Sequence, residues 1–200
     1  MTNPFFVTIE GIDGSGKTSV AKSLNKNFDN TLQTQEPSDW KTGTWVRELL
    51  KADGTPPLTD FYLFLADRVG HVQYEIEPAL EDNKLVICDR YVDSTRAYQQ
   101  ELLSDSVPNT EEFIEEQLSL FPEPDLTLYL DIPVDVAMKN VDSEEKYEKR
   151  EFLTKVRQNY IELEKNTDRI VRVDSERHIE DVKDGCINLV EIFSDKESKI

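Results

Sequence analysis

The sequence predicts an α/β fold in three layers: a five-stranded parallel sheet with helices on both faces, and a short charged lid. Short apolar runs alternate with segments of helical periodicity, and strands separated by helices form parallel sheets covered on both faces. Three of the runs end at a carboxylate, Glu36, Asp89 or Asp131. Because ligands of such folds bind at the carboxyl ends of the strands, we expect these side chains to converge on one crevice.

Each predicted strand is a short apolar run between turn or helix signals. Residues 84–89 form a continuous apolar run that ends in aspartate, as expected for a strand buried on both faces. Residues 125–131 carry leucine at every second position from Leu126. In chain order, the strands are predicted at residues 5–10, 32–35, 84–89, 125–131 and 169–173.

The segments between these runs have apolar residues at helical spacing. The longest such pattern extends from Leu58 to about Leu80, and the turn at residues 53–57 separates it from the helix before it. Pro133 suits the first turn of a later helix. The helices are predicted at residues 17–24, 45–50, 58–80, 92–105, 110–120, 133–141, 152–163 and 177–194. We expect a single domain over residues 1–200, with a frayed tail at residues 194–200.

Composition limits the partners of the chain. Its 200 residues include 41 acidic and 23 basic side chains, and the net charge of −18 repels nucleic acid and anionic membranes. A salt-rich cytoplasm would also favour an acidic surface, but lysine is not scarce, so this origin stays open. We expect no signal peptide and no membrane span, hence a cytoplasmic protein. Cys88 and Cys186 are expected to be buried free thiols in a reducing compartment.

The turn after the first strand matches the P-loop pattern G-x-x-x-x-G-K-[ST]. Its glycines allow the backbone N–H groups to turn inward as an anion-binding nest, to which the following helix adds its N-terminus. In such a loop the lysine reaches the β- and γ-phosphates of ATP, and the last hydroxyl binds Mg²⁺. The predicted phosphate-binding residues are Gly11, Ile12, Asp13, Gly14, Ser15, Gly16, Lys17 and Thr18.

The flanking strand and helix make a P-loop NTPase fold a better interpretation than a glycine-rich turn without a ligand. The motif alone does not distinguish a kinase from an ATPase or a switch protein. Asp89 ends a buried strand, where a carboxylate would order Mg²⁺, and the fork of Arg90 beside it suits a second anion such as an acceptor phosphate. The alternative is a structural Asp–Arg pair at the end of a strand.

Two further stretches have both a functional and a structural interpretation. Phe64 and Arg68 are four residues apart on a predicted helix, so they share a face that suits a nucleotide base. From spacing alone, a buried Phe64 and an Arg68 paired with Asp67 or Glu75 are favoured instead. Residues 142–150 are almost wholly charged, which is typical of a solvated linker or helix face, or else of a mobile lid that carries cations.

Together these stretches resemble thymidylate kinases over residues 5 to about 175, in the same order and at similar spacing. The resemblance is carried by residues 5–18, 36–37, 64–68, 89–99 and 146–152, and the Asp-Arg-Tyr…Ser…Ala-Tyr-Gln pattern of residues 89–99 is its most specific part. It implies transfer of the γ-phosphoryl group of ATP to dTMP, with Mg²⁺, by a homodimer. The alternatives are a kinase for dUMP or a deoxynucleoside, and a P-loop ATPase or switch.

The resemblance also implies roles for single residues. Phe64 would stack on thymine, Arg68 would bond its O4 atom, Arg90 would hold the dTMP phosphate, and Tyr98 would exclude a 2′-hydroxyl. Asp13 would lie in the transfer path. The implied dTMP-binding residues are Glu36, Arg47, Phe64, Arg68, Arg90, Ser94, Thr95, Tyr98 and Gln99, and the implied Mg²⁺ ligands are Thr18, Asp89 and Asp13.

The chain departs from the family pattern at the source of its catalytic cation. Some members carry an arginine in the P-loop where this chain has Gly14, and members without it supply cations from the lid. The catalytic residues implied are therefore Asp13, Lys17 and Arg90 together with the lid cations Lys146, Lys149 and Arg150. A cation over the transferred phosphoryl group stabilises the charge on its equatorial oxygens. Lys146 and Asn140 stand where many members have arginine.

Overall fold

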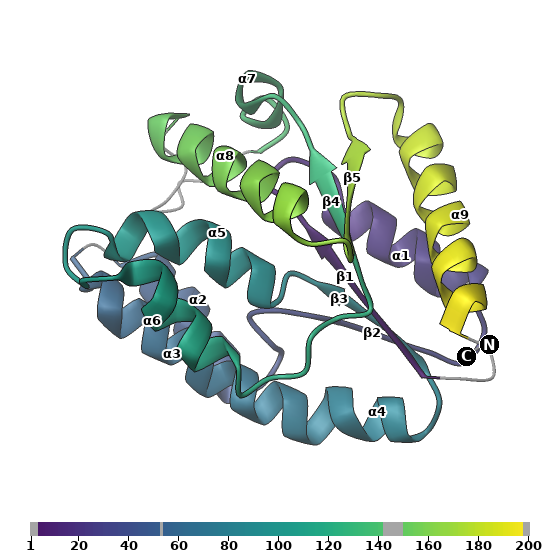
Figure 1. The fold of residues 1–200 in the computed structure, drawn as a ribbon, viewed down its shortest axis with the longest axis horizontal. Coiled ribbons are helices and arrows are strands. Elements are labelled where there is room, and N and C mark those ends of the chain that lie inside the picture. Colours follow the sequence, from purple (N-terminus) through teal and green to yellow (C-terminus); the bar gives the residue numbers. More distant parts are fainter. Residues whose placement is uncertain (1–3, 53, 142–149, 198–200) are drawn as a thin grey trace.

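A computed structural model describes residues 4–52, 54–141 and 150–197. Its centre is a five-stranded sheet in which neighbouring strands of the described residues are parallel, so the predicted α/β class is confirmed (Figure 1). The order across the sheet is β2-β3-β1-β4-β5. The strands are β1 (Phe5–Glu10), β2 (Thr31–Gln35), β3 (Leu85–Asp89), β4 (Leu126–Asp131) and β5 (Ile170–Asp174).

The burial of each strand depends on its position in the sheet. Every residue of the three central strands β1, β3 and β4 is buried, whereas the edge strands β2 and β5 are only partly covered. Side chains alternate along β1: Phe5, Val7 and Ile9 pack in one core cluster, and Phe6 packs in another on the opposite face. By the same alternation Glu10 points to the face on which Phe6 lies, and its carboxylate contacts Tyr91 there.

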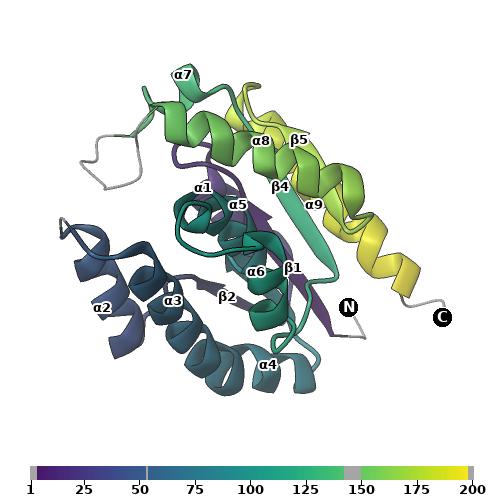
Figure 2. The ribbon, with the colours of Figure 1, turned by 60° about the vertical axis from the view of Figure 1, so that its left-hand side comes forward.

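Helices cover both faces of the sheet, as Figures 1 and 2 show. On one face α1 (Lys17–Asn27) and α9 (Ile179–Glu197) pack in the same cluster as Val7 and Ile9. The other face carries α3 (Pro57–His71), the π-helical η1 (Val72–Ile76), α4 (Glu77–Glu81), α5 (Val92–Leu103), α6 (Thr110–Leu118) and α8 (Arg150–Asn166). Helix α2 (Lys41–Leu50) packs on α3.

Three helical predictions need correction. The helix predicted at residues 58–80 is α3, η1 and α4 in succession. The helix predicted at residues 133–141 is only α7 (Val134–Ala137), because the chain then tightens into bonds between residues three apart, from Lys139 to Val136 and from Asn140 to Ala137. Helix α9 extends to Glu197, further than the predicted end at residue 194.

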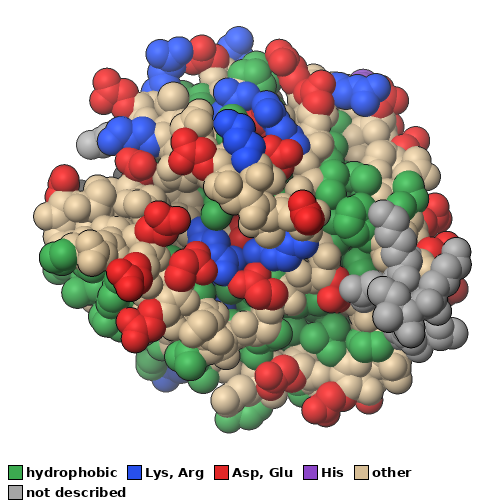
Figure 3. All heavy atoms as spheres, viewed as in Figure 1, with side chains coloured by type: hydrophobic (Ala, Val, Ile, Leu, Met, Phe, Trp, Pro, Cys, Tyr) green, Lys and Arg blue, Asp and Glu red, His purple; other side chains and the backbone are tan. Residues whose placement is uncertain are grey.

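Cys88 and Cys186 are buried free thiols, as expected. Within the described ranges, no helix is long and apolar enough to cross a bilayer. Most of the predicted lid, residues 142–149, lies outside the described residues. Figure 3 shows acidic side chains spread over one face of the molecule, with Lys and Arg gathered towards its upper part and centre.

Candidate active site

The P-loop connects β1 to α1 and has the backbone of an anion nest. Gly14 and Gly16 have φ values of 82° and 96°, in the left-handed region that favours glycine. A Cβ atom on Gly14 would lie 2.3 Å from the carbonyl oxygen of Ala137, the last residue of α7. The Asn140 amide also donates to the Gly14 carbonyl oxygen at 3.0 Å. The chain around α7 therefore closes over the loop and leaves no space for a side chain at position 14.

Three charged side chains meet at the mouth of this loop. Arg90 donates from Nη2 to Oδ1 of Asp13, and Nζ of Lys17 lies 3.4 Å from the same oxygen. Burial alone would raise the pKa of Asp13, but the positive charges of Arg90 and Lys17 outweigh it and lower that pKa. Asp13 is therefore ionised at neutral pH and links the P-loop lysine to Arg90.

A pair of oxygen ligands lies beside this triad. The hydroxyl of Thr18 donates to Oδ2 of Asp89 at 2.8 Å, because β1 and β3 are neighbours and the P-loop helix begins beside the end of β3. Mg²⁺ in nucleotide sites keeps waters and takes one or two carboxylates plus substrate phosphates. Among the described residues no group of three His, Cys, Asp or Glu side chains is placed to hold a metal. Thr18 and Asp89 fit a Mg²⁺ ion that is shared with a nucleotide.

Two cavities meet at these residues. One, of about 210 Å³, is lined by all nine side chains predicted to bind dTMP. The other, of about 380 Å³, is lined by the P-loop and Asp89. The two cavities share five of their lining residues, Asp13, Glu36, Pro37, Arg47 and Arg90. The structure thus brings the predicted acceptor pocket and the predicted donor site together at Asp13 and Arg90.

Arg68 lines the smaller cavity. Its side chain is 1% exposed and donates through Nε and Nη2 to Glu36, with a shortest distance of 2.6 Å. Nη2 also donates to the Thr95 hydroxyl at 2.9 Å. Burial alone would lower the pKa of Arg68, but the charge of Glu36 outweighs it and raises that pKa. The alternative partners weighed from the sequence, Asp67 and Glu75, are wrong.

Among the described residues that line this cavity, three buried polar atoms have no hydrogen-bond partner. The Tyr91 hydroxyl is one of them. The others are Nη1 of Arg68, which can only donate, and Oε1 of Gln99, which can only accept. Burying such atoms without a partner is unfavourable, and native proteins leave few of them. Phe64 lines the pocket too, half-buried, from one helical turn before Arg68. The atoms of Arg68 and Gln99 are suited to a planar ligand that offers an acceptor beside a donor.

Comparison with known proteins agrees with this geometry. The family model described as thymidylate kinase matches residues 9–185. The chain belongs to the thymidylate kinase family. A probable thymidylate kinase of Halobacterium salinarum is 39% identical over 172 residues, which are 84% of this chain and 86% of the relative. One of Pyrobaculum aerophilum is 40% identical over 160 residues, 78% and 81% of the two chains. The thymidylate kinase of Ligilactobacillus salivarius is 34% identical over 207 residues, 94% and 98%.

Arg47 has a structural task in this member of the thymidylate kinase family. It donates to the carbonyl oxygens of Pro37 and Ser38 at 2.5 and 2.7 Å, and to Asp39 at 3.2 Å. Its guanidinium therefore holds the turn after β2, although it also lines both cavities. A contact from Arg47 to the acceptor phosphate stays a prediction.

Of the three predicted lid cations, Arg150 is the one that lies within the described residues. Lys146 and Lys149 lie outside them. Arg150 begins α8, is exposed, and forms a two-bond ion pair with Asp135 at 2.7 and 2.8 Å. It lines neither of the two cavities. The catalytic role of these three cations stays a prediction.

One strand-end carboxylate is directed elsewhere. Asp131 ends β4, but Arg157 binds its Oδ1 at 2.6 Å and Arg172 binds its Oδ2 from Nε at 2.9 Å. Asp131 lines neither cavity, so the expectation that all three strand-end carboxylates converge on one crevice is wrong for it. The reason is local: two arginines from α8 and β5 reach the end of β4 and neutralise the carboxylate there.

Several lining residues of the smaller cavity are not among those predicted from the sequence. Leu102 lies one turn after Tyr98 on α5, so helical spacing from the Tyr98–Gln99 pair would have found it. Leu50 lies one turn after Arg47 in the same way. Leu153 comes from α8, and no local signal connects it with the pocket. Glu10, which contacts Tyr91 and Ser94 of the site, was also missed.

Proposed function

We propose that the chain transfers the γ-phosphoryl group of ATP to dTMP, giving ADP and dTDP for dTTP synthesis. The observation that carries this proposal is a donor and an acceptor among the three unpartnered buried atoms of the acceptor pocket, Nη1 of Arg68 and Oε1 of Gln99. Thymine offers an acceptor, O4, beside a donor, N3–H. Cytosine has an amino donor and an acceptor nitrogen at these positions, the reverse pattern. The pocket therefore fits thymine or uracil better than cytosine.

The surrounding contacts explain why Arg68 is preorganised for this task. The Glu36 carboxylate accepts hydrogen bonds from Nε and Nη2 of the Arg68 guanidinium. The Thr95 hydroxyl and the Tyr91 carbonyl oxygen also accept from Nη2. Only Nη1 is left over. A donor that is fixed before the ligand arrives loses little entropy on binding. Phe64 lines the pocket from the same helix, and we propose that it stacks on the base.

The transfer itself is a matter of position and charge. Phosphoryl transfer passes through a loose transition state, so the protein contributes by aligning the groups and balancing charge. The P-loop N–H groups and Lys17 would hold the β- and γ-phosphates, and Arg90 the acceptor phosphate. Thr18 and Asp89 would hold Mg²⁺, which neutralises charge on the donor phosphates when it is bound. The carboxylate of Asp13, which lines both cavities, forms ion pairs with Lys17 and with Arg90.

Tyr98 lines the acceptor pocket with a ring that its neighbours hold in place. Its ring lies 5.2 Å below the guanidinium carbon of Arg90, and Phe152 and Tyr160 pack against it edge-on, with centroids 6.0 and 6.4 Å away. A ring held on three sides cannot move aside for an additional hydroxyl. We propose that this fixed ring selects a 2′-deoxyribose.

The outer face of α3 and η1 supports a homodimer as part of this proposal. Tyr62, Val69 and Tyr74 are 49%, 43% and 65% exposed, and Trp40 stacks on Tyr74 with ring centroids 5.2 Å apart. Exposed aromatic groups of this kind mark interaction surfaces. Sedimentation of the wild type and of Tyr74→Glu tests this: we expect a dimer that the variant weakens, and a monomeric wild type would contradict it. We also propose that the protein acts in the cytoplasm, where its nucleotide substrates are found.

A coupled ADP-release assay over a panel of nucleoside monophosphates tests the activity. We expect dTMP to be the best acceptor and dUMP to be about tenfold weaker, because one methyl group in an apolar pocket is worth about that much. We expect dCMP, dGMP and AMP to give background rates. ADP release that is equally fast without any acceptor would contradict the proposal and favour an ATPase or switch.

A further inference from the structure

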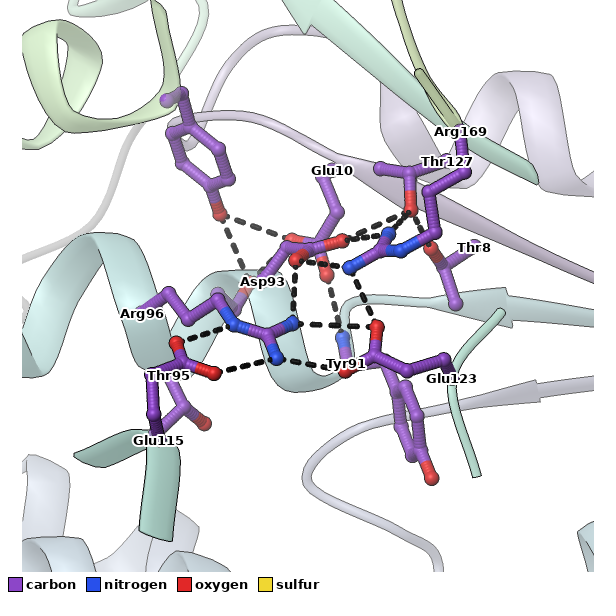
Figure 4. A network of polar contacts seen from close by, with 12 residues as sticks. Thr8, Glu10, Tyr91, Asp93, Thr95, Arg96, Glu115, Glu123, Thr127 and Arg169 are labelled. Atoms are coloured by element: carbon purple, nitrogen blue, oxygen red, sulfur yellow. Dashed lines mark hydrogen bonds and ion pairs between the residues drawn. The ribbon is translucent and has the colours of Figure 1, made fainter. Parts of the chain in front are cut away.

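Glu10 is a buried carboxylate that the reaction as described above does not use. It is the last residue of β1, directly before the P-loop, and its relative exposure is 0%. Oε1 accepts a hydrogen bond from the Tyr91 amide at 2.7 Å (Figure 4). Oε2 accepts from the hydroxyls of Ser94 and Tyr160 at 2.5 and 2.9 Å. All three donors are neutral. Within the described part of the chain, no ion pair of Glu10 is found.

Asp93, a nearby buried carboxylate with a structural role, differs from Glu10 in its partners. Arg169 binds both oxygens of Asp93 at 2.7 and 2.9 Å, and Arg96 binds Oδ1 at 2.9 Å (Figure 4). Although burial alone would raise it, the pKa of Asp93 is lowered by these arginines. Asp93 is a balanced buried charge, whereas Glu10 is not.

Stability does not account for the charge on Glu10. An amide of the same size would still accept the Tyr91 N–H bond, and hydroxyls such as those of Ser94 and Tyr160 can accept a hydrogen bond as well as donate one. An uncompensated buried carboxylate costs more to desolvate than an amide. A carboxylate at this position is therefore better explained by what it does to its partners.

Two of the partners of Glu10, the Tyr91 amide and the Ser94 hydroxyl, are directly connected to Arg90. The Tyr91 amide follows Arg90 directly, and Arg90 has a φ of 70°, in the left-handed region that side chains rarely adopt. The Ser94 hydroxyl donates to Glu10 and accepts from Nη1 of Arg90 at 3.2 Å. Glu10 thus acts on Arg90 at two points. It fixes the backbone directly after Arg90, and it orients the Ser94 hydroxyl that contacts the Arg90 guanidinium.

We propose that Glu10 is a positioning residue for the acceptor phosphate, a step that rests on the proposed function. In its ionised form the carboxylate accepts from Ser94, so the lone pairs of that hydroxyl stay free for Nη1 of Arg90. The guanidinium is then held with Nη2 directed to Asp13, at the junction of the two cavities. A glutamine at position 10 would donate to Ser94 from its amide nitrogen and compete with Arg90 for those lone pairs.

The test compares Glu10→Gln with Thr8→Val in the full chain. Thr8 lies two residues earlier on β1, is buried, and bonds the Thr127 hydroxyl at 2.8 Å without contacting Arg90. For Glu10→Gln we expect the KM for dTMP to rise and kcat/KM to fall at least tenfold. The KM for ATP should stay within twofold, and Tm should be no lower than that of the wild type. For Thr8→Val we expect both KM values unchanged, whatever happens to Tm.

A wild-type KM and kcat for dTMP in Glu10→Gln would overturn the inference. So would equal increases of the KM for dTMP and for ATP, since these would indicate a general structural role. If Glu10→Gln does not fold, Tyr160→Phe, which removes one of the three donors, should raise the KM for dTMP two- to fivefold without changing that for ATP, and an unchanged KM would overturn the inference. Failure of the wild type to phosphorylate dTMP would instead overturn the proposed function.

Discussion

Arg90 donates from Nη2 to Asp13, a residue 77 positions earlier in the chain. This ion pair joins the end of β3 to the P-loop and places one guanidinium on the boundary of both cavities. Arg90 also contacts the ring of Tyr98 and the hydroxyl of Ser94. A single side chain is therefore in contact with the P-loop aspartate and with two predicted acceptor-binding residues.

Arg90→Ala should lower kcat/KM for dTMP by more than 100-fold, because it removes the proposed acceptor-phosphate ligand and the fork that fixes Asp13. Arg90→Lys keeps the positive charge without the fork and should fall between the wild type and the alanine variant. The ADP-release assay measures both, and far-UV circular dichroism checks the fold. Near-wild-type turnover of Arg90→Ala would contradict the proposed role.

Gln99→Met should lower kcat/KM for dTMP by about 10- to 100-fold, because the N3–H group of the base would lose its acceptor in a buried site. Gln100→Met is the matched control. Gln100 is the next residue of α5 and lines a separate cavity, between α5, α6 and α8, so its replacement should leave the kinetics unchanged. Equal effects of the two substitutions would show that the Gln99 amide does not read the base.

The part of the fold that positions the site is predictable because its signals are local. An apolar run of five or six residues indicates a buried strand, and the P-loop is a contiguous pattern at residues 11–18. Phe64 and Arg68, one helical turn apart, also line the same pocket. Helical spacing does not predict the partner of a long side chain: Glu36, which pairs with Arg68, lies 32 residues away in the turn after β2.

The incorrect predictions have the same origin. Asp131 and Asp89 look alike in the sequence, since each ends an apolar run. They differ only because Arg157 and Arg172 reach Asp131, whereas Thr18 reaches Asp89. Glu10 likewise looks like an ordinary residue at the end of a strand. Its three donors come from the turn after β3, from α5 and from α8, and only the packed structure brings them together.

Glu10 should make the stability of the protein depend on pH. Burial, together with the nearby charge of Asp93, raises its pKa to about 7 from an ordinary value of 4.5, despite the opposing charge of Arg90. Between these two pH values the folded state binds more protons than the unfolded state. The free energy of unfolding therefore falls as pH rises from about 4.5 to 7 and levels off above, by an amount of the order of 3 kcal/mol.

Urea denaturation of the wild type and Glu10→Gln at pH 5 and pH 8 measures this effect. The glutamine variant should gain stability relative to the wild type at pH 8, where the wild-type carboxylate is buried in its charged form, and little at pH 5. Thr8→Val should differ from the wild type by the same amount at both pH values. A pH-independent difference for Glu10→Gln would show that Glu10 does not titrate in this range.

Gly14 and Gly54 form a pair that separates backbone strain from steric exclusion. Their φ values are 82° and 85°, so an alanine at either position meets a similar penalty of about 1 kcal/mol from the backbone. A Cβ on Gly14 would also lie 2.3 Å from the Ala137 carbonyl oxygen, whereas a Cβ on Gly54 would meet nothing within 4 Å. Gly14→Ala must therefore displace the chain around α7 or the P-loop itself.

Gly54→Ala should lower the free energy of unfolding by about 1 kcal/mol and leave the KM for ATP unchanged. Gly14→Ala should lower it by at least 1 kcal/mol more and raise the KM for ATP about tenfold or more, because the loop N–H groups would no longer point at one anion. Similar losses in both variants would mean that the chain at α7 yields easily. In that case a side chain could enter the P-loop at position 14, and the absence of an arginine there would not be imposed by the fold.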